Sequence, residues 1–233
     1  MTWGIIAAMD EELNHILAEM KVERTLPAYG TTYHIGTIDG VPVVAVRCSV
    51  GTINAAVCTS TLIRELGVTR VVNIGAAGST CDELSILDVV LGSELVFHDA
   101  QGDFLAQFYP FRDRFLADQK LLELAERAIS RMEPKNFRYR VGRIATGDVF
   151  VQDPAVKEDI VRRCHPLCVE MEGAAVAQAA FLCGTPFLVI RSLSDDAGHG
   201  AQLSFEQFVE QAARNSADIV LGMIRQSGQE GTH

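Results

Sequence analysis

The feature that most constrains this chain is the alternation of short apolar runs with amphipathic segments along its whole length. Apolar, often β-branched runs closed by glycine, serine or an acid predict strands at residues 3–9, 41–50, 70–78, 87–97, 139–147 and 186–194. Helical periodicity predicts helices at 10–20, 53–66, 118–132, 153–164, 172–182 and 204–224. This order predicts an α/β fold, in which a central mixed, mainly parallel twisted sheet is flanked by helices.

The length of 233 residues suits one such domain, and no stretch of the sequence has the composition of a linker. We expect this single domain to span residues 1–225. The polar, glycine-containing residues 226–233 are expected to form a flexible C-terminal tail.

Charge and cysteine content narrow the range of partners and compartments. The formal net charge is −10 and no Lys- or Arg-rich run is present, which argues against nucleic acid or a membrane as partner and favours a small molecule. The six cysteines are scattered among apolar neighbours without zinc-type spacing, so we expect reduced thiols and no metal. The chain opens without a basic, signal-like segment, and no later stretch reaches membrane-spanning length, so the expected location is cytoplasmic.

Two glutamates, Glu170 and Glu172, lie within the otherwise apolar stretch "VEMEGAAVA" at residues 169–177. Acids in the first turn of a helix complement its dipole, and this is one interpretation of the pair. Burial of an unpaired carboxylate is costly, however, and the flanking residues are apolar on both sides. The alternative is that the pair serves a ligand or a proton transfer.

Further acids and glycine turns follow other predicted strands, at the edge where open α/β sheets bind ligands. They lie in "AAMDEE", "NIGAAGS", "ATGDVFV" and "RSLSDDA". Together with "VEMEGAA", these motifs resemble, in order and spacing, those of the 5′-methylthioadenosine/S-adenosylhomocysteine nucleosidases, which belong to the nucleoside phosphorylase and nucleosidase superfamily. The resemblance covers nearly the whole chain. It implies a nucleoside phosphorylase-like fold, no cofactor, and hydrolysis of the N-glycosidic bond of an adenine nucleoside with a 5′ thioether.

The resemblance also implies roles for the acids. Asp195 matches the family's acid that protonates adenine N7, and Ser194 would orient it. Glu172 matches the residue that holds the ribose hydroxyls, and Glu12 matches the general base that Arg191 would hold in place. Such roles suit a bond whose cleavage leaves positive charge on the sugar and negative charge on the base. Simpler alternatives remain: Asp195 as a helix cap or loop acid, and Glu12 as one of the acids that begin a helix.

Binding residues follow from the same resemblance. Phe150 would stack on adenine, and the backbone of Val151 would bind the edge of the base. Met9 and Met171 would line the ribose, although ordinary core packing also explains a methionine near a strand end. Phe205 would cover the 5′ substituent. Glu170 is included as a substrate-binding candidate, with a structural role as the alternative.

Position 76 departs from the family pattern. The motif "NIGAAGS" supplies Ala76 and Gly78 to the expected substrate site, and Ala76 replaces a serine that helps to place water in relatives. Related phosphorylases use a hydroxyl there, and arginines near the N-terminus, to bind phosphate. This chain has an alanine in place of the hydroxyl and acids in place of the N-terminal arginines, which favours water as the nucleophile.

The segment 98–115 also differs from the family, in the region that builds the 5′ pocket with residues from a partner subunit, so substrate preference stays open. Phe104, Phe108 and Tyr109 form an apolar cluster that needs cover, and we expect a homodimer. Three other functions remain possible: a purine nucleoside phosphorylase, an aminodeoxyfutalosine nucleosidase, and a nucleoside-binding protein without turnover.

Overall fold

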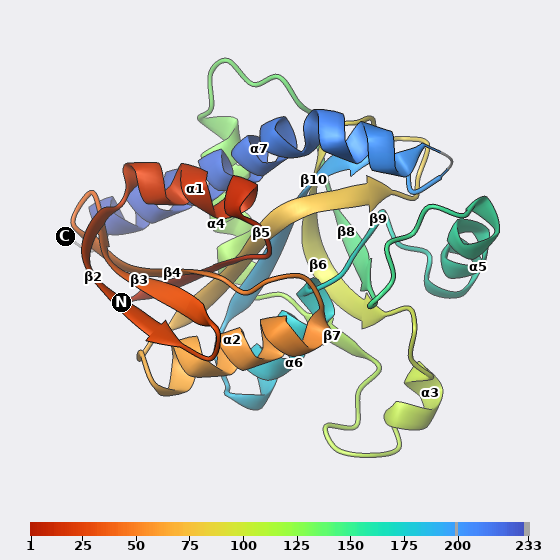
Figure 1. Cartoon of the computed structure of the whole chain (residues 1–233), viewed down its shortest axis with the longest axis horizontal. Helices are drawn as coiled ribbons and strands as arrows, with labels where there is room; N and C mark the ends of the chain where they lie inside the picture. Colours follow the sequence, from red (N-terminus) through yellow and green to blue (C-terminus); the bar gives the residue numbers. More distant parts are fainter. Residues whose placement is uncertain (199, 231–233) are drawn as a thin grey trace.

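The computed structural model describes residues 1–198 and 200–230, and these fold into alternating strands and helices (Figure 1). The strands are β1 (Trp3–Ala7), β2 (Lys21–Ala28), β3 (Thr31–Ile38), β4 (Val41–Arg47), β5 (Arg70–Ser79), β6 (Val89–Phe97), β7 (Arg114–Leu116), β8 (Tyr139–Thr146), β9 (Cys168–Glu170) and β10 (Phe187–Asp195). The helices are α1 (Asp10–Glu19), α2 (Thr52–Arg64), α3 (Gly102–Leu105), α4 (Gln119–Ser130), α5 (Pro154–Cys164), α6 (Gly173–Leu182) and α7 (Ala201–Glu230).

The strands form one mixed sheet in the order β2-β3-β4-β1-β5-β10-β6-β8-β9, and β9 returns to pair with β5. Parallel pairings join β1 to β4 and β5, β5 to β10, β6 to β8, and β8 to β9. Antiparallel pairings join β2 to β3, β3 to β4, β10 to β6, β5 to β9, and β6 to β7. The expected mixed sheet is therefore present. Within it, β5, β10, β6, β8 and β9 form a closed ring of paired strands.

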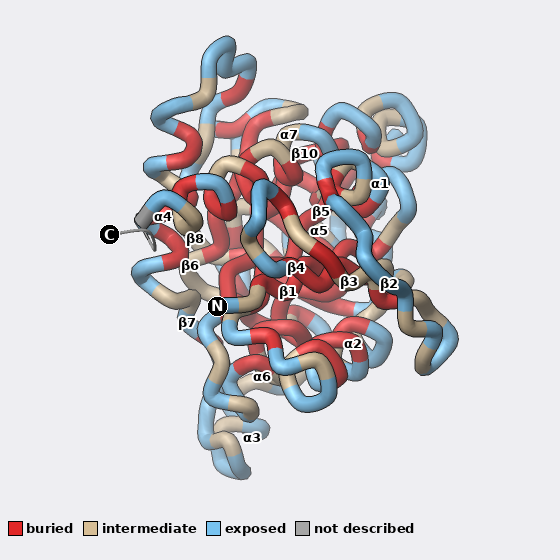
Figure 2. The backbone as a smooth tube through the Cα atoms, turned by 90° about the vertical axis from the view of Figure 1, so that its left-hand side faces the viewer, coloured by how far each residue is buried: buried red, intermediate tan, exposed pale blue. Residues whose placement is uncertain are grey.

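Helices cover both faces of the sheet, as the alternation predicts. Figure 1 shows α1, α4 and α7 on one face and α2 and α6 on the other. One apolar core joins β1, β5 and β10 to α1, α4 and α7, and a second core joins the opposite face to α2 and α6. In Figure 2 the central strands run through the buried interior, and every residue of β1 and β10 is buried.

The six predicted strands and six predicted helices are confirmed, with small shifts at their ends. The hairpin of β2 and β3 was not predicted. Most of β2 is exposed, so its side chains lack the apolar pattern of a buried strand. The two short strands β7 and β9 and the single-turn helix α3 were also missed.

The domain was predicted to end at residue 225, with a flexible tail after it. Helix α7 continues to Glu230, and Gln226 on it is buried, so residues 226–230 extend the last helix instead of forming a tail. Gly222 and Gly228 lie within this helix, where an added Cβ would lie 3.1 Å from Ala128 Cβ and 2.8 Å from Val41 Cγ2, so glycine allows close packing at both positions. Residues 231–233 lie outside the described part of the chain.

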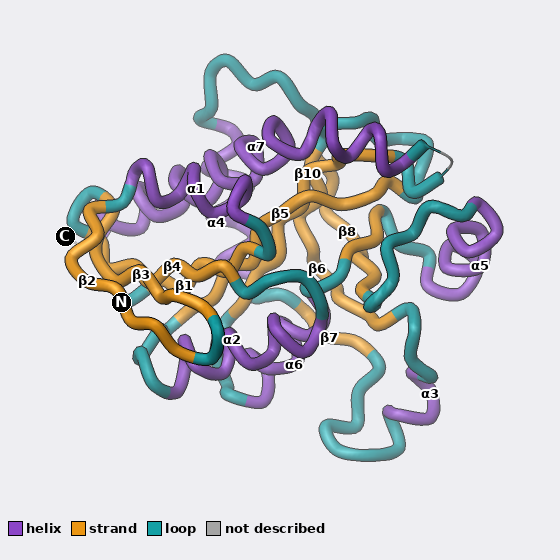
Figure 3. The backbone as a smooth tube through the Cα atoms, in the orientation of Figure 1, coloured by secondary structure: helices purple, strands orange, loops and turns teal. Residues whose placement is uncertain are grey.

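Loops gather at the carboxyl ends of the central parallel strands (Figure 3). The segments after β1, β5 and β10 leave the sheet at this edge, because these three strands share one direction through their parallel pairings. Strand β8 runs in the opposite direction, but its end reaches the same region through β9, where Thr146 pairs with Glu170 and Val169 pairs with Gly78. This edge brings together the acids that the sequence separates by up to about 180 residues. Within the described residues, no helix is long and apolar enough to cross a membrane.

Candidate active site

Glu12 lies at the start of α1 with only 3% of its surface exposed, whereas its neighbour Glu11 is exposed. Its Oε2 accepts hydrogen bonds from the backbone N–H groups of Ala8 (2.8 Å) and Met9 (3.1 Å), and its Oε1 accepts from the N–H of Ala76 (3.0 Å). The carboxylate therefore caps its own helix and also bridges to the end of β5. The helix-start interpretation suffices for Glu11, but for Glu12 it does not explain the hydrogen bond from Ala76.

Arg191 lies on β10 and is 1% exposed, with three carboxylates around its guanidinium. It donates to Glu170 from both Nε and Nη2, to Glu172 Oε2 at 3.4 Å and to Asn73 Oδ1 at 2.7 Å. Burial acts to lower the pKa of Arg191, but the charges of Glu170, Glu172 and Glu12 outweigh it and raise that pKa above its ordinary value. One arginine cation is thus shared by the whole cluster.

Arg191 was expected to hold Glu12 in place, but no hydrogen bond between the two side chains is present among the described contacts. Backbone N–H groups hold Glu12 instead, and Arg191 acts on it through charge. The Nη1 of Arg191 is buried without a hydrogen-bond partner. A Cβ atom built on Gly75 would lie 2.6 Å from Glu12 Oε1 and 2.8 Å from Arg191 Nη1, so both atoms border the same small space. Only glycine lets the backbone pass there.

Glu170 and Glu172 differ in their partners. Glu170 accepts from Thr146 Oγ1, from the N–H groups of Glu172 (3.0 Å) and Gly173 (2.7 Å), and from Arg191. Protein donors occupy both of its oxygens, which favours the structural interpretation of Glu170 over substrate binding. Glu172 has fewer donors, with the N–H of Gly51 at 2.8 Å from Oε1 and Arg191 at Oε2.

Burial raises the pKa of both Glu12 and Glu172. For Glu172, burial comes first and repulsion from Glu170 second, and together they raise its pKa to about 8. For Glu12, burial outweighs the opposing effects of Arg191 and the backbone N–H groups. Glu172 is therefore poised to hold or release a proton near neutral pH, and Glu12 binds a proton more readily than an exposed glutamate does.

Asp195 ends β10 and is 2% exposed. Its Oδ2 accepts from Ser194 Oγ at 2.9 Å, which is the orienting contact that the resemblance implies, and its Oδ1 accepts from the N–H of Ala197 at 2.8 Å. Gly78 on β5 faces it so closely that a Cβ there would lie 2.8 Å from Oδ1. Burial is the largest effect on its carboxyl group and raises the pKa of Asp195. A helix cap is excluded, because α7 begins only at Ala201.

Aromatic residues complete this edge of the sheet. The rings of Phe150 and Phe205 meet edge to face with centroids 5.9 Å apart, and Phe150 is 36% exposed. Val151 is buried in a small cluster that also contains Ala197, two residues after Asp195. Of the predicted base-binding residues, Val151 therefore shares a buried cluster with a close neighbour of the predicted acid in the chain.

The two methionines lie next to the carboxylates. Met9 precedes α1 and packs partly against the apolar core, and Met171 separates Glu170 from Glu172 and is half-buried. Both the packing and the ribose-lining interpretations are compatible with these positions.

Sequence reasoning missed three residues that build the cluster. Asn73 accepts from Arg191 and donates to the carbonyl of Ile6, and Thr146 donates to Glu170 and accepts from the N–H of Ala174. Gly51 donates its N–H to Glu172. A polar residue inside the apolar run "VVNIG" marked Asn73 in the sequence, and Thr146 ends a predicted strand. Nothing near Gly51 in the sequence points to Glu172.

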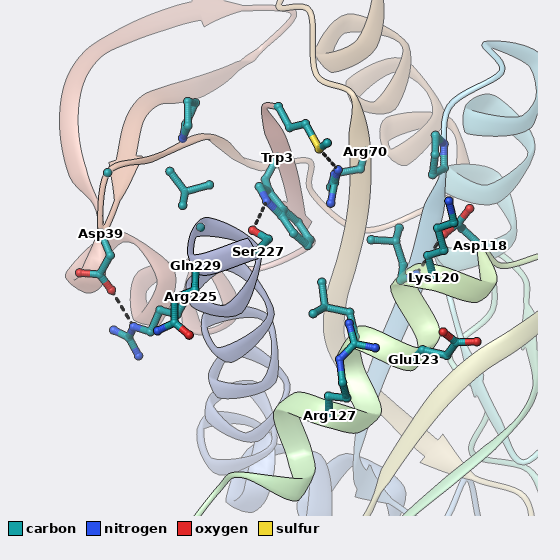
Figure 4. Close-up of a pocket in the computed structure, with 18 residues that line it drawn as sticks. Trp3, Asp39, Arg70, Asp118, Lys120, Glu123, Arg127, Arg225, Ser227 and Gln229 are labelled. Atoms are coloured by element: carbon teal, nitrogen blue, oxygen red, sulfur yellow. Dashed lines mark hydrogen bonds and ion pairs between the residues drawn. The ribbon is translucent and has the colours of Figure 1, made fainter. Parts of the chain in front are cut away.

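A separate cavity with a volume of about 1340 Å³ lies where β1 and β5 begin, at the opposite edge of the sheet (Figure 4). Its size alone would admit a nucleoside. Arg70 and Trp3 line it together with charged residues of both signs, including Asp39, Lys120 and Glu123. Its lining contains none of the predicted site residues, and we therefore place the candidate active site at the carboxyl edge. Among residues 1–198 and 200–230, no cluster of three or more His, Cys, Asp or Glu side chains is arranged to hold a metal ion.

Comparison with known proteins agrees with the resemblance seen in the sequence. A family model described as the phosphorylase superfamily matches residues 2–225. A 5′-methylthioadenosine/S-adenosylhomocysteine nucleosidase from Geobacillus thermodenitrificans is 38% identical over 229 residues, which cover 96% of this chain and 96% of the relative.

Solved structures agree in fold. The nucleosidase of that name from Colwellia psychrerythraea, in complex with adenine, has a TM-score of 0.92 at 35% identity, covering 97% of this chain and 95% of that one. The futalosine hydrolase of Helicobacter pylori has a TM-score of 0.88 at 30% identity, covering 97% and 98%. The chain therefore belongs to the phosphorylase superfamily and, within it, to the family of the 5′-methylthioadenosine/S-adenosylhomocysteine nucleosidases.

Proposed function

We propose that this chain hydrolyses the N-glycosidic bond of 5′-methylthioadenosine and S-adenosylhomocysteine, releasing adenine and the 5-thio-substituted ribose. The observation that supports this most is the pairing of two groups at one edge of the sheet. Glu12 and Glu172 share the charge of Arg191 on one side. On the other, Asp195 ends β10 two residues before Ala197, which shares a buried cluster with Val151, the neighbour of Phe150. The names of the relatives indicate the same activity for those proteins.

The carboxylates favour the transition state over the substrate. When the glycosidic bond breaks, the ribose ring becomes cationic, whereas it is neutral in the bound nucleoside. When Glu12 and Glu172 are deprotonated, three buried carboxylates around one guanidinium leave the cluster with surplus negative charge. This surplus charge stabilises a positive sugar much more than a neutral one, which is the condition for catalysis by differential binding.

Glu12 and Arg191 suit the activation of water. Glu12 Oε1 and Arg191 Nη1 border the same space beside Gly75, and Nη1 has no protein acceptor. We assign this space to the attacking water, which would accept from Nη1 and give its proton to Glu12. The raised pKa of Glu12 makes it a better proton acceptor than an exposed carboxylate.

Asp195 suits protonation of the leaving base. Its raised pKa favours the protonated form, and Ser194 fixes one of its oxygens. The exposed side of Phe150 offers a flat surface for adenine, and the backbone of Val151 would bind the edge of the base. Met9 and Met171 would line the ribose, and Phe205 would cover the 5′ substituent.

Replacing Ala76 by Ser tests how the water is placed. The N–H of Ala76 already donates to Glu12, so a hydroxyl at this position would lie beside the proposed water. We expect the dissociation constant of adenine to stay nearly unchanged and kcat to change. Steady-state kinetics and calorimetry of adenine binding measure the two quantities separately. An unchanged kcat would show that another group positions the water in this chain.

We also propose that the protein is a homodimer. Phe104, Phe108 and Tyr109 are 53%, 55% and 73% exposed on and after α3, and the rings of Phe104 and Phe108 lie 5.2 Å apart. Ile53 on α2 is 76% exposed. An apolar surface of this kind is stable in water when a second copy covers it.

Light scattering of the purified protein is expected to give twice the mass of 25.4 kDa. Phe108→Asp is expected to shift the mass towards the monomer and to lower activity, because a partner loop would complete the 5′ pocket. Val22→Asp on the exposed strand β2 is the control and is expected to stay dimeric. A fully active wild-type monomer would contradict the proposal.

The choice of substrate is tested by comparing kcat/KM for 5′-methylthioadenosine, S-adenosylhomocysteine and aminodeoxyfutalosine, with release of adenine as the signal. We expect the first two to be preferred. The similarity to a futalosine hydrolase supports aminodeoxyfutalosine as the second candidate, and a higher kcat/KM for it would change the assignment. Tight binding of all three without release of adenine would indicate a nucleoside-binding protein.

The cytoplasm is the proposed location. The six cysteines, all within the described residues, are free, and those that are buried have thiols packed among apolar side chains. Free thiols suit a reducing compartment.

A further inference from the structure

Asp148 has no assigned role in the proposed reaction, yet it joins two distant parts of the site. It lies in the loop between β8 and α5, two residues before Phe150 (Figure 3). Its Oδ1 accepts from the N–H of Thr52 at 2.8 Å, and its Oδ2 accepts from the hydroxyl of Thr52 at 2.6 Å. Thr52 is the first residue of α2 and is 96 positions away in the sequence.

The start of α2 depends on this contact. The residue before the helix is Gly51, which has no side chain to cap it, and the first turn of α2 contains no acid. Asp148 supplies both the missing hydrogen-bond acceptor and a negative charge at the positive end of the helix dipole. Gly51 has a φ of +106° and approaches Asp148 closely, since a Cβ there would lie 3.2 Å from Oδ1. Glycine is therefore required at this position.

The same turn holds Glu172. The N–H of Gly51, one residue before Thr52, donates to Glu172 Oε1 at 2.8 Å. A continuous series of contacts therefore runs from the loop of Phe150, through Asp148 and the start of α2, to the carboxylate proposed to hold the ribose. A displacement of the loop would therefore act on Gly51 through Thr52, and on one of the contacts that orient Glu172.

The other side of Asp148 is also fixed. Its backbone N–H donates to Asp99 Oδ2 at 2.9 Å, and the preceding Gly147 donates to the carbonyl of Glu170 at 3.1 Å. His98 fills the space above Gly147, where a Cβ would lie 2.3 Å from His98 Cε1. The backbone of the loop is thus attached to the segment after β6 and to β9, and the Asp148 carboxylate adds the attachment to α2.

We propose that Asp148 is a positioning residue that fixes the base-stacking loop and the ribose-holding Glu172 relative to each other, through the N-terminus of α2. This inference rests on the proposed function for the roles of Phe150 and Glu172. Its physical basis is that a misplacement of about 1 Å far from the chemistry can lower a rate by about 10²-fold.

The test measures adenine release by Asp148→Ala, Asp148→Asn and Thr52→Val with 5′-methylthioadenosine. Asp148→Ala is expected to lower kcat/KM by about 10- to 100-fold. Thr52→Val loses one of the two bonds and Asp148→Asn keeps an acceptor for the Thr52 N–H, so both are expected to lie between Asp148→Ala and wild type. Asp118→Ala is the matched control, because Asp118 caps α4 through the N–H of Leu121 at 3.0 Å and lies at the opposite edge of the sheet. It is expected to lower Tm and leave kcat/KM unchanged.

A double-mutant cycle separates positioning from loss of stability. In the Glu172→Gln background, Asp148→Ala is expected to cost less in kcat/KM than in wild type, because part of its effect acts through Glu172. The inference would be overturned if Asp148→Ala kept the kcat/KM of wild type. It would also be overturned if the fold-loss in kcat/KM of the double variant equalled the product of the losses of the two single variants.

Failure of the proposed function gives a different result. In that case wild type itself releases no adenine, and hydrogen exchange then tests the contact directly. The amides of Gly51 and Thr52 are expected to exchange faster in Asp148→Ala than in Asp118→Ala. Equal exchange in the two variants would overturn the inference.

Discussion

Replacing Glu12 by Gln is expected to lower kcat by about two to four orders of magnitude, the usual contribution of a general base. Glutamine has nearly the same shape but cannot accept the proton of the attacking water. Its NH₂ group would also face N–H donors, since the backbone of Ala8, Met9 or Ala76 donates to each carboxylate oxygen. Single-turnover kinetics with 5′-methylthioadenosine measure the chemical step.

Glu11→Gln is the matched control for Glu12→Gln. Glu11 is the neighbouring acid in the first turn of α1, but it is exposed. Its replacement removes the same charge from the same helix and is expected to leave kcat near that of wild type. If Glu12→Gln retains wild-type kcat with an unchanged Tm, the proton of the water goes elsewhere.

Replacing Asp195 by Asn is expected to lower kcat by about two to four orders of magnitude while nucleoside analogues still bind. Adenine is a poor leaving group as an anion, and protonation of N7 removes that difficulty. Asparagine keeps an oxygen that accepts from Ser194 or Ala197 but cannot give a proton to the base. Calorimetry with an analogue and steady-state kinetics separate binding from turnover.

Asp196→Asn is the control for the adjacent acid. The Oδ1 of Asp196 accepts from the N–H of Gly198 at 3.1 Å, and the side chain is exposed. This variant is expected to keep near wild-type kcat. Near-full turnover by Asp195→Asn would instead show that adenine is protonated by another group, and the role of Asp195 would be wrong.

The buried strands of the fold were predictable from the sequence because they are continuous apolar runs. Strands β2 and β3 were missed. Strand β3 is joined to β4 by the "DG" turn of Asp39 and Gly40, whose φ values are 48° and 81°, and such a turn typically joins two antiparallel strands. The turn could therefore have predicted β3 from the sequence. Strand β2 has no apolar pattern because most of it is exposed, and it is held in the sheet by pairing with β3.

The candidate site was predictable where a residue follows a strand, and less so where contacts cross between distant segments. Glu12 and Asp195 lie at one edge because β1, β5 and β10 are parallel neighbours. Glu172 follows the short strand β9, which pairs antiparallel with β5 and was not predicted. The partners of Arg191 depend on which carboxylate reaches it in three dimensions, and the sequence does not contain that information. The same applies to Gly51, whose N–H is directed at Glu172 by the turn before α2.

The most direct test of the central claim is the identity of the sugar product formed from 5′-methylthioadenosine with and without inorganic phosphate. Mass spectrometry distinguishes 5-methylthioribose from its 1-phosphate. The arrangement of Glu12 beside Arg191 Nη1 predicts water as the nucleophile, so adenine and 5-methylthioribose are expected at the same rate in both conditions. Strict dependence on phosphate, with 5-methylthioribose 1-phosphate as the product, would contradict the account.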